Sequence, residues 1–92
     1  MKLWDASTGE YRRTLNGHTN DVHGCAFSPI YGNLVLSCSV DKRLKLWDAA
    51  TGACTATLEG HEDKIFCCAF SPDGATIASG DALGKLKLWR RA

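Results

Sequence analysis

Short apolar runs separated by turn residues recur along the chain, and they predict strands rather than helices. In the stretches 43–47 ("RLKLW") and 84–89 ("GKLKLW"), apolar and polar residues alternate strictly, as in a strand with one covered face. The other expected strands are 2–5, which is the end of a third strand, and 10–15, 21–27, 34–38, 53–58, 64–70 and 76–79. Turn residues such as "SPDG", "SVDK" and "ATG" separate them, so the pattern predicts an all-β chain of antiparallel strands.

Some of these runs are apolar at every position. The run "IFCCAF" (65–70) has no polar side, so we expect the strand to be covered on both faces. Sheets stacked face to face, each sandwiched between copies of itself, would provide that cover.

The pattern occurs twice. Trp4 and Trp47 are 43 residues apart and Trp47 and Trp89 are 42 apart, and about half the positions are identical when 3–47 is aligned with 46–89. Such a period is typical of repeat architectures. We therefore interpret residues 1–92 as a single unit of two repeats, about 3–47 and 46–89. Each repeat holds four antiparallel strands.

Several short motifs then resemble those of the WD-repeat family of β-propellers, over nearly the whole chain. They are Gly-His at 17–18 and 60–61, "AFSP" at 26–29 and 69–72, "SCSVD" at 37–41 and "LKLWD" at 44–48. The resemblance implies four-stranded propeller blades, each repeat contributing the strands of one. It also implies a non-catalytic scaffold for protein interactions rather than an enzyme.

The first repeat contains a set of polar side chains that can be interpreted either as a catalytic triad or as a structural network. His18, Ser37 and Asp41, together with Trp47, could be a base, a nucleophile and an orienting carboxylate. The resemblance implies instead a structural tetrad, in which buried indole and imidazole groups find hydrogen-bond partners. Because no glycine-framed nucleophile elbow surrounds Ser37, we favour the tetrad.

The second repeat offers His61, Ser79 and Trp89 for the same network, but Leu83 stands where the first repeat has Asp41. Asp81, two residues earlier, is the candidate substitute. From this mismatch we expect an incomplete second tetrad and a looser turn.

The number of blades raises a further question, because a propeller needs about four to eight and this chain has two. The chain begins with an outer strand (about 10–15) that lacks its sheet, and its C-terminal blade lacks its own outer strand. The resemblance implies that, in complete WD propellers, an N-terminal outer strand closes the ring by completing the last blade. We expect head-to-tail homo-oligomers, in which three copies give six blades and four give eight. The alternatives are a fragment of a longer multi-repeat protein and a designed or truncated repeat chain with no selected partner.

A protein or peptide partner is expected on the rim that carries the loops before each first strand and the "SVDK"-type turns. The candidate rim residues are Asn20, Asp21, His23, Val40, Lys42, Lys64, Phe66 and Ala82. Phe66 is either an anchor for a partner or a packing residue against the neighbouring blade.

Composition narrows the possible partners, cofactors and cellular location of the chain. The net charge is +1 with both signs interspersed, so we expect no nucleic-acid partner and no membrane partner, and no motif indicates a cofactor or a metal. The five cysteines are odd in number and form no CxxC pair, a pattern typical of buried thiols in a reducing compartment. With no apolar signal segment at the N-terminus, we expect a cytoplasmic, intracellular protein.

Overall fold

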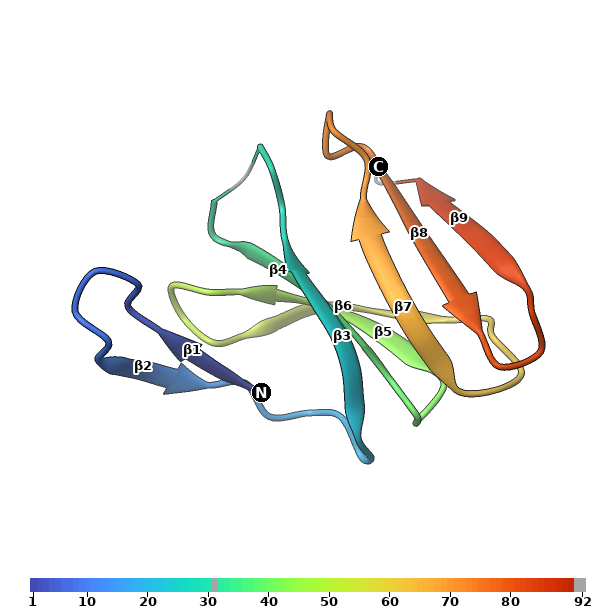
Figure 1. Cartoon of the computed structure of the whole chain (residues 1–92), viewed down its shortest axis with the longest axis horizontal. Helices are drawn as coiled ribbons and strands as arrows, with labels where there is room; N and C mark the ends of the chain where they lie inside the picture. The colour runs from blue at the N-terminus through green and yellow to red at the C-terminus, as the bar shows by residue number, and fades with distance from the viewer. Residues whose placement is uncertain (31, 91–92) are drawn as a thin grey trace.

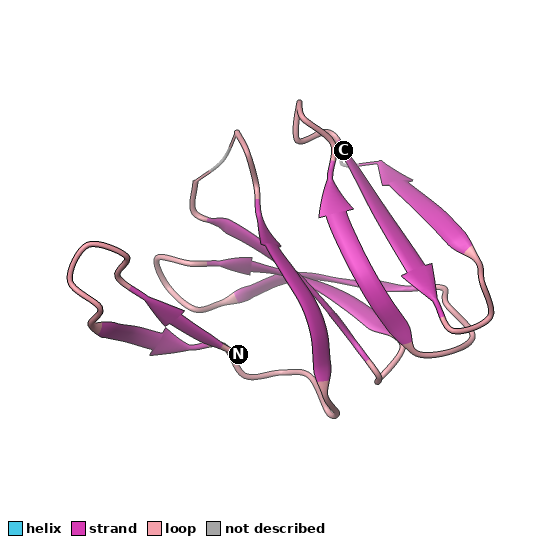
Figure 2. Ribbon diagram, viewed as in Figure 1, coloured by secondary structure: helices cyan, strands magenta, loops and turns pink. Residues whose placement is uncertain are grey.

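The computed structural model describes residues 1–30 and 32–90, which form nine antiparallel strands in three sheets joined by turns (Figures 1 and 2). The strands are β1 (Lys2–Trp4), β2 (Tyr11–Thr14), β3 (Val22–Phe27), β4 (Leu34–Ser39), β5 (Arg43–Asp48), β6 (Cys54–Glu59), β7 (Ile65–Phe70), β8 (Thr76–Asp81) and β9 (Leu86–Arg90). The all-β, antiparallel prediction is confirmed, and the bounds differ from the predicted ones by at most two residues.

The three sheets are different portions of one repeated blade. The four-stranded sheet β3-β4-β5-β6 is a whole blade, here called the first blade; the sheet β7-β8-β9, the second sheet, repeats its first three strands. The N-terminal hairpin β1-β2 repeats its last two. In the hairpin Leu3 pairs with Arg13 and in the first blade Leu46 pairs with Ala56, and each pair is followed by the same shift in register.

The main core lies between the first blade and the second sheet. It is formed by Leu36, Cys38, Leu44, Leu46, Ile65 and Ile77, which alternate along β4, β5, β7 and β8 with residues of the opposite face. Burying a side chain of this size contributes roughly 1.5–3 kcal/mol, so this interface holds the two sheets together. A smaller cluster of Leu15, Val35 and Trp47 joins the hairpin to the first blade.

The expectation that the first strand of each repeat is covered on both faces is wrong for this chain. Along β3, Val22, His23, Cys25 and Phe27 are exposed, and Phe66 is half exposed on β7. The physical reason is geometric: a sheet is covered on both faces only when it has a neighbour on each side, and the chain supplies one neighbour for each of these strands.

The expectation of buried thiols is also wrong for three of the five cysteines. Cys25, Cys54 and Cys67 are exposed, Cys68 is half buried and Cys38 is fully buried, and all five are free thiols. The exposed ones lie on β3, β6 and β7, on surfaces that none of the three described sheets covers.

No helix in the described residues is long and apolar enough to cross a lipid bilayer.

Candidate functional site

The first tetrad joins two strands, a loop and a turn around one buried hydroxyl. Trp47 on β5 donates its indole N–H to Ser37 Oγ on β4 at 2.8 Å, and His18 Nε2 lies 2.6 Å from the same oxygen. The other imidazole nitrogen, Nδ1, lies 2.8 Å from Asp41 Oδ2 in the β4–β5 turn. The network therefore fastens the loop before β3 to the sheet.

Chemistry fixes the direction of these hydrogen bonds. A carboxylate only accepts, so His18 Nδ1 carries the proton that it donates to Asp41. Ser37 Oγ accepts from Trp47 and uses its own hydrogen to donate to His18 Nε2. In this arrangement every polar hydrogen of the four side chains at the junction has an acceptor, and the network holds the imidazole ring in place.

The second tetrad is complete, contrary to the expectation drawn from Leu83. Trp89 donates to Ser79 Oγ at 2.8 Å, His61 Nε2 lies 2.6 Å from Ser79 Oγ, and His61 Nδ1 lies 2.7 Å from Asp81 Oδ2. The side chains of His61 and Asp81 are fully buried. Asp81 on β8 supplies the carboxylate that the turn lacks.

The predicted looser turn is wrong for the same reason. Asp81 occupies the position equivalent to Ser39, and its second carboxylate oxygen accepts the amide hydrogens of Leu83 and Lys85. Both turns keep a left-handed residue at the equivalent position, Lys42 with φ 73° and Gly84 with φ 81°. The turn therefore keeps its shape although the carboxylate comes from a different residue.

Both carboxylates are held in the charged form. Burial alone would raise the pKa of Asp41, but hydrogen bonds from His18 and from the amides of Thr19 and Arg43 outweigh it and lower the pKa below its ordinary value. The hydrogen bond from His61 is the main reason that the pKa of Asp81 is also lowered. The tetrads are thus anionic at one end at neutral pH.

The same distances occur in a hydrolase triad, but this arrangement is sealed. Ser37 and Ser79 have no exposed surface, and each hydroxyl oxygen already accepts the hydrogen of a tryptophan. A substrate carbonyl has no path to either oxygen, so the two constellations serve structure.

The glycine of each Gly-His motif has a role that the sequence interpretation missed. A Cβ on Gly17 would lie 2.9 Å from the Trp47 ring, and a Cβ on Gly60 would lie 3.0 Å from the Trp89 ring. Each indole therefore packs directly on a glycine backbone. The signal in the sequence was the recurrence of Gly before His at the same distance from Trp.

The aspartates of the two Trp-Asp motifs cap the turns that follow them. Asp5 accepts the amides two and three residues later at 2.8 and 3.1 Å, and Asp48 does so at 2.8 and 3.3 Å. Gly9 and Gly52 follow with positive φ and close the turns onto the aspartate carbonyls. These residues shape the outer connection of the blade.

The structure brings the candidate rim residues to one end of the sheets, the lower edge in Figure 1. Seven of them are exposed and Val40 is half buried. Val40 donates its amide to the Asp21 carbonyl and Ala82 to the Lys64 carbonyl, both at 2.9 Å, so each loop before a first strand is tied to the next turn. The rim is therefore ordered by main-chain contacts that repeat in both halves.

Two aromatic rings bridge the rim between the sheets. His23 on β3 and Phe66 on β7 pack edge to face with centroids 5.1 Å apart, and both remain exposed. Phe66 thus packs against the neighbouring blade, which is one of the two roles considered from the sequence, and it still presents an apolar face to solvent.

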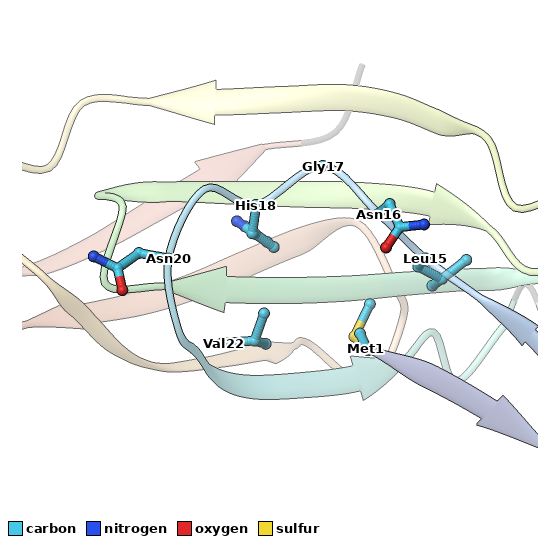
Figure 3. A pocket seen from close by; sticks show the side chains of 7 residues that line it. All are labelled: Met1, Leu15, Asn16, Gly17, His18, Asn20 and Val22. Atoms are coloured by element: carbon cyan, nitrogen blue, oxygen red, sulfur yellow. The ribbon is translucent and has the colours of Figure 1, made fainter.

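A cavity of about 520 Å³ opens beside the first tetrad (Figure 3). The connection from Leu15 to Asn20 arches over it, with Met1 and Val22 below, and His18 reaches it from above. It lies on the side of the first blade that faces the hairpin. In the described part of the chain no group of three or more His, Cys, Asp or Glu side chains is arranged to hold a metal ion.

Comparisons with known proteins agree with this geometry. Transcription initiation factor TFIID subunit 5 from Drosophila melanogaster is 46% identical over 44 residues, which is 48% of this chain and 6% of that protein. Proteasomal ATPase-associated factor 1 from Homo sapiens is 59% identical over 29 residues, 32% of this chain and 7% of that protein. The chain thus spans a small part of the length of these relatives.

The sequence profile of the WD domain, G-beta repeat, matches residues 9–48 and 52–90, which together make up most of the chain. The two matched segments coincide with the two hydrogen-bonded tetrads. The chain belongs to the WD40 repeat family.

Proposed function

We propose that this chain is a non-catalytic scaffold that binds a protein or peptide on the rim defined above. The WD40 family serves generally in protein interaction, and the sealed tetrads leave these repeats with a structural role. The His23–Phe66 pair carries the proposal, because it places an exposed aromatic surface at the junction of two sheets.

The surroundings of this pair fit an extended segment with an acidic residue. Lys64 and Lys42 lie exposed on the neighbouring loop and turn, and Asn20 offers a neutral amide. Interface hot spots are enriched in aromatic side chains, so this pair is the expected anchor for an apolar side chain of the partner. The two lysines would favour a carboxylate beside that side chain, because opposite charges across an interface are complementary.

A peptide-array screen with the whole chain tests this function. We expect Phe66→Ala and Lys64→Ala to weaken a captured peptide, Phe66→Ala by about tenfold or more, because central aromatic anchors dominate binding. Ile30→Ala removes an exposed apolar side chain at the opposite end and is the matched control. Unchanged binding in the Phe66 and Lys64 variants would exclude this rim, and capture of no peptide at all would favour a repeat chain without a selected partner.

We also propose that the chain assembles head to tail into a ring of three or four copies, giving six or eight blades. The three sheets hold nine of the twelve strands of three four-stranded blades: among the described residues, the hairpin has the last two strands of a blade and the second sheet has the first three. Whole two-blade units cannot produce seven blades.

Light scattering after size exclusion tests the assembly. Three or four chains of 10.0 kDa would give about 30 or 40 kDa. A species near 10 kDa at every concentration would overturn the ring.

With three exposed free thiols, we place the chain in a reducing, cytoplasmic compartment, which fractionation of the source cells would test.

A further inference from the structure

We propose that Cys38 and Cys68 are a redox-active pair, which hydrogen peroxide converts to a disulfide that joins the first blade to the second sheet within one chain. These two residues are called the thiol pair below. The inference goes beyond binding on the rim and beyond assembly, because it concerns the interface between two sheets of the same chain. It stands whether or not several copies assemble.

The strand registers turn the two side chains toward each other. Directly opposed residues of an antiparallel strand pair share a face of the sheet. Cys38 is opposite Gly24 on β3, on the face of the first blade that packs on the second sheet. Cys68 is opposite Ser79 of the second tetrad, on the face of the second sheet that the first blade covers. The thiols therefore meet in the main core, where Cys68 packs against the cluster that contains Cys38.

Gly24 makes room for both sulfur atoms. A Cβ on Gly24 would lie 3.0 Å from Cys38 Sγ and 3.7 Å from Cys68 Sγ, so the two sulfurs flank one point in space. The same Cβ would lie 3.9 Å from Cys67 Cα, because β3 and β7 run side by side at this place (Figure 1). A side chain at position 24 would occupy the space between the sulfurs. Glycine leaves the two thiols facing each other across the interface.

A hydrogen bond between the two thiols prepares one of them for oxidation. It lowers the pKa of Cys38 below its ordinary value and raises the pKa of Cys68, which burial raises further. Cys68 therefore keeps its hydrogen and donates it, and Cys38 is the sulfur that more readily becomes a thiolate. Because the thiolate is the nucleophile in thiol oxidation, Cys38 attacks the peroxide and Cys68 completes the disulfide.

Hydrogen peroxide supplies the oxidising equivalents. The Cys38 thiolate attacks one peroxide oxygen and the O–O bond breaks, which leaves a sulfenic acid on Cys38 and releases hydroxide. The Cys68 sulfur then attacks the Cys38 sulfur, so that the S–S bond forms and the S–O bond breaks. The proton lost by Cys38 converts the hydroxide to water, and the Cys68 proton leaves with the second oxygen as water. The two sulfurs together lose two electrons, and the peroxide gains two.

Burial selects a small oxidant and makes the step reversible only by a strong reductant. Cys38 has no exposed surface and Cys68 is half buried, so a small uncharged molecule approaches the pair past Cys68. A disulfide formed there is restored to two thiols by exchange with a dithiol. In a reducing compartment such a bond is transient and responds to peroxide.

The three exposed thiols point elsewhere and are replaceable. Cys25 is opposite Ser37, on the other face of the first blade from Cys38. Cys67 lies over Gly80 of its own sheet, where a Cβ would be 2.8 Å from its sulfur. Cys54 is on the outer strand β6 of the first blade. Serine at these three positions therefore leaves the thiol pair and its surroundings in place.

The experiment uses the whole chain with Cys25→Ser, Cys54→Ser and Cys67→Ser, so that only the thiol pair remains. After treatment with hydrogen peroxide and blocking of free thiols with iodoacetamide, the mass of the single chain should fall by two hydrogens. Trypsin should then release residues 14–42 joined to residues 65–85, and dithiothreitol should separate them. Adding Cys68→Ala leaves one thiol and is the matched control, which should yield no joined peptide.

Three results would overturn the thiol pair. The first is a sulfinic acid or a blocked thiol at Cys38 with no joined peptide. The second is joined peptides that occur only in a species of two chains. The third is an equal yield of joined peptide from the chain in concentrated urea, since the bond would then not depend on the fold that brings the sulfurs together.

The stability of the oxidised chain tests whether the bond fits the interface. A disulfide between positions 38 and 68 closes a loop of about 30 residues, and a cross-link of this size should raise the melting temperature by roughly 10 °C. The Cys68→Ala control should melt at the same temperature before and after peroxide. A joined peptide without a rise in melting temperature would show that the bond forms only by distorting the sheets, and it would overturn the disulfide as a native link between them.

Discussion

The two repeats build the same network from different sequences, and the difference lies in where the carboxylate stands. In the first repeat His and Asp are 23 residues apart and in the second they are 20 apart, yet the Nδ1–Oδ2 distances are 2.8 and 2.7 Å. The requirement is thus for a carboxylate at a point in space beside the imidazole. A strand residue and a turn residue can both reach that point.

The repeats also differ in what covers them. A whole blade covers the second tetrad, whereas a two-stranded hairpin covers the first. The tryptophans differ the other way: Trp47, on a strand paired on both edges, is fully buried, and Trp89, on a strand paired only with β8 among the described residues, is half buried. Each repeat therefore has one incomplete side.

The largest effect should come from the tryptophans. We expect Trp47→Ala to lower the free energy of unfolding by about 3–5 kcal/mol, as for other buried aromatic side chains, and Trp89→Ala to lower it by less. Urea denaturation of each variant measures this. Trp4→Ala, at an exposed position, is the control. Equal losses at positions 47 and 89 would contradict the difference in cover.

The glycines beneath the indoles give the next largest effect. Gly17→Ala and Gly60→Ala each force a methyl group against a ring, and overpacking of this kind costs about 1–3 kcal/mol. The loss should be greater at Gly17, because Trp47 is fixed in a buried cluster. Gly32→Ala, where a Cβ would meet nothing within 4 Å, should leave the denaturation midpoint unchanged.

Moving the carboxylate of the second repeat tests whether its position in the sequence matters. Asp81→Ser should lower the melting temperature by roughly 5 °C, because His61 Nδ1 and two amides lose their acceptor. Adding Leu83→Asp recreates the arrangement of the first repeat and should recover most of the loss. If the double variant melts no higher than the single one, the two turns are not interchangeable.

The lowered pKa values of Asp41 and Asp81 predict a loss of stability in acid. A carboxyl group whose pKa is lower in the folded state stabilises the fold above its unfolded pKa, near 4, and this contribution is lost as the pH falls through the folded value. The free energy of unfolding of the unaltered chain, measured by urea denaturation, should therefore fall below about pH 4. In Asp41→Asn with Asp81→Asn the slope should be flatter, and the other carboxylates account for what remains.

The smallest effect concerns the left-handed turn residue. Lys42 adopts a positive φ that Gly84 adopts without a side-chain penalty. Lys42→Gly should change stability by less than about 1 kcal/mol, since relief of strain is offset by greater freedom in the unfolded chain. Gly84→Lys should destabilise more than that. Calorimetry of the Lys42→Gly and Gly84→Lys variants measures both changes in stability.

Much of the fold followed from the sequence because its determinants are local. Alternation in "RLKLW" defined a strand, and the spacing of Trp4, Trp47 and Trp89 defined the repeat. The partners of His18 were also accessible, since a buried indole and imidazole must find hydrogen bonds.

The features that could not be predicted depend on residues that become neighbours only in the folded structure. Alignment placed Leu83 opposite Asp41, but only the folded turn brings Asp81 within reach of His61. Exposure of Cys25 and Cys67 depends on how many sheets are stacked, which no single residue encodes. The position of a glycine under each indole could likewise not be predicted from the sequence, because it depends on the path of the loop before the first strand of each repeat.

The three tryptophans lie at three depths, and this has a spectroscopic consequence. Trp4 is exposed in the hairpin, Trp89 is half buried in the second sheet and Trp47 is fully buried in the first blade. A soluble quencher of indole fluorescence should reach them in that order. Single-tryptophan variants would thus give each of the three sheets its own optical signal, so that the detachment of the hairpin and the unfolding of either repeat can be timed separately.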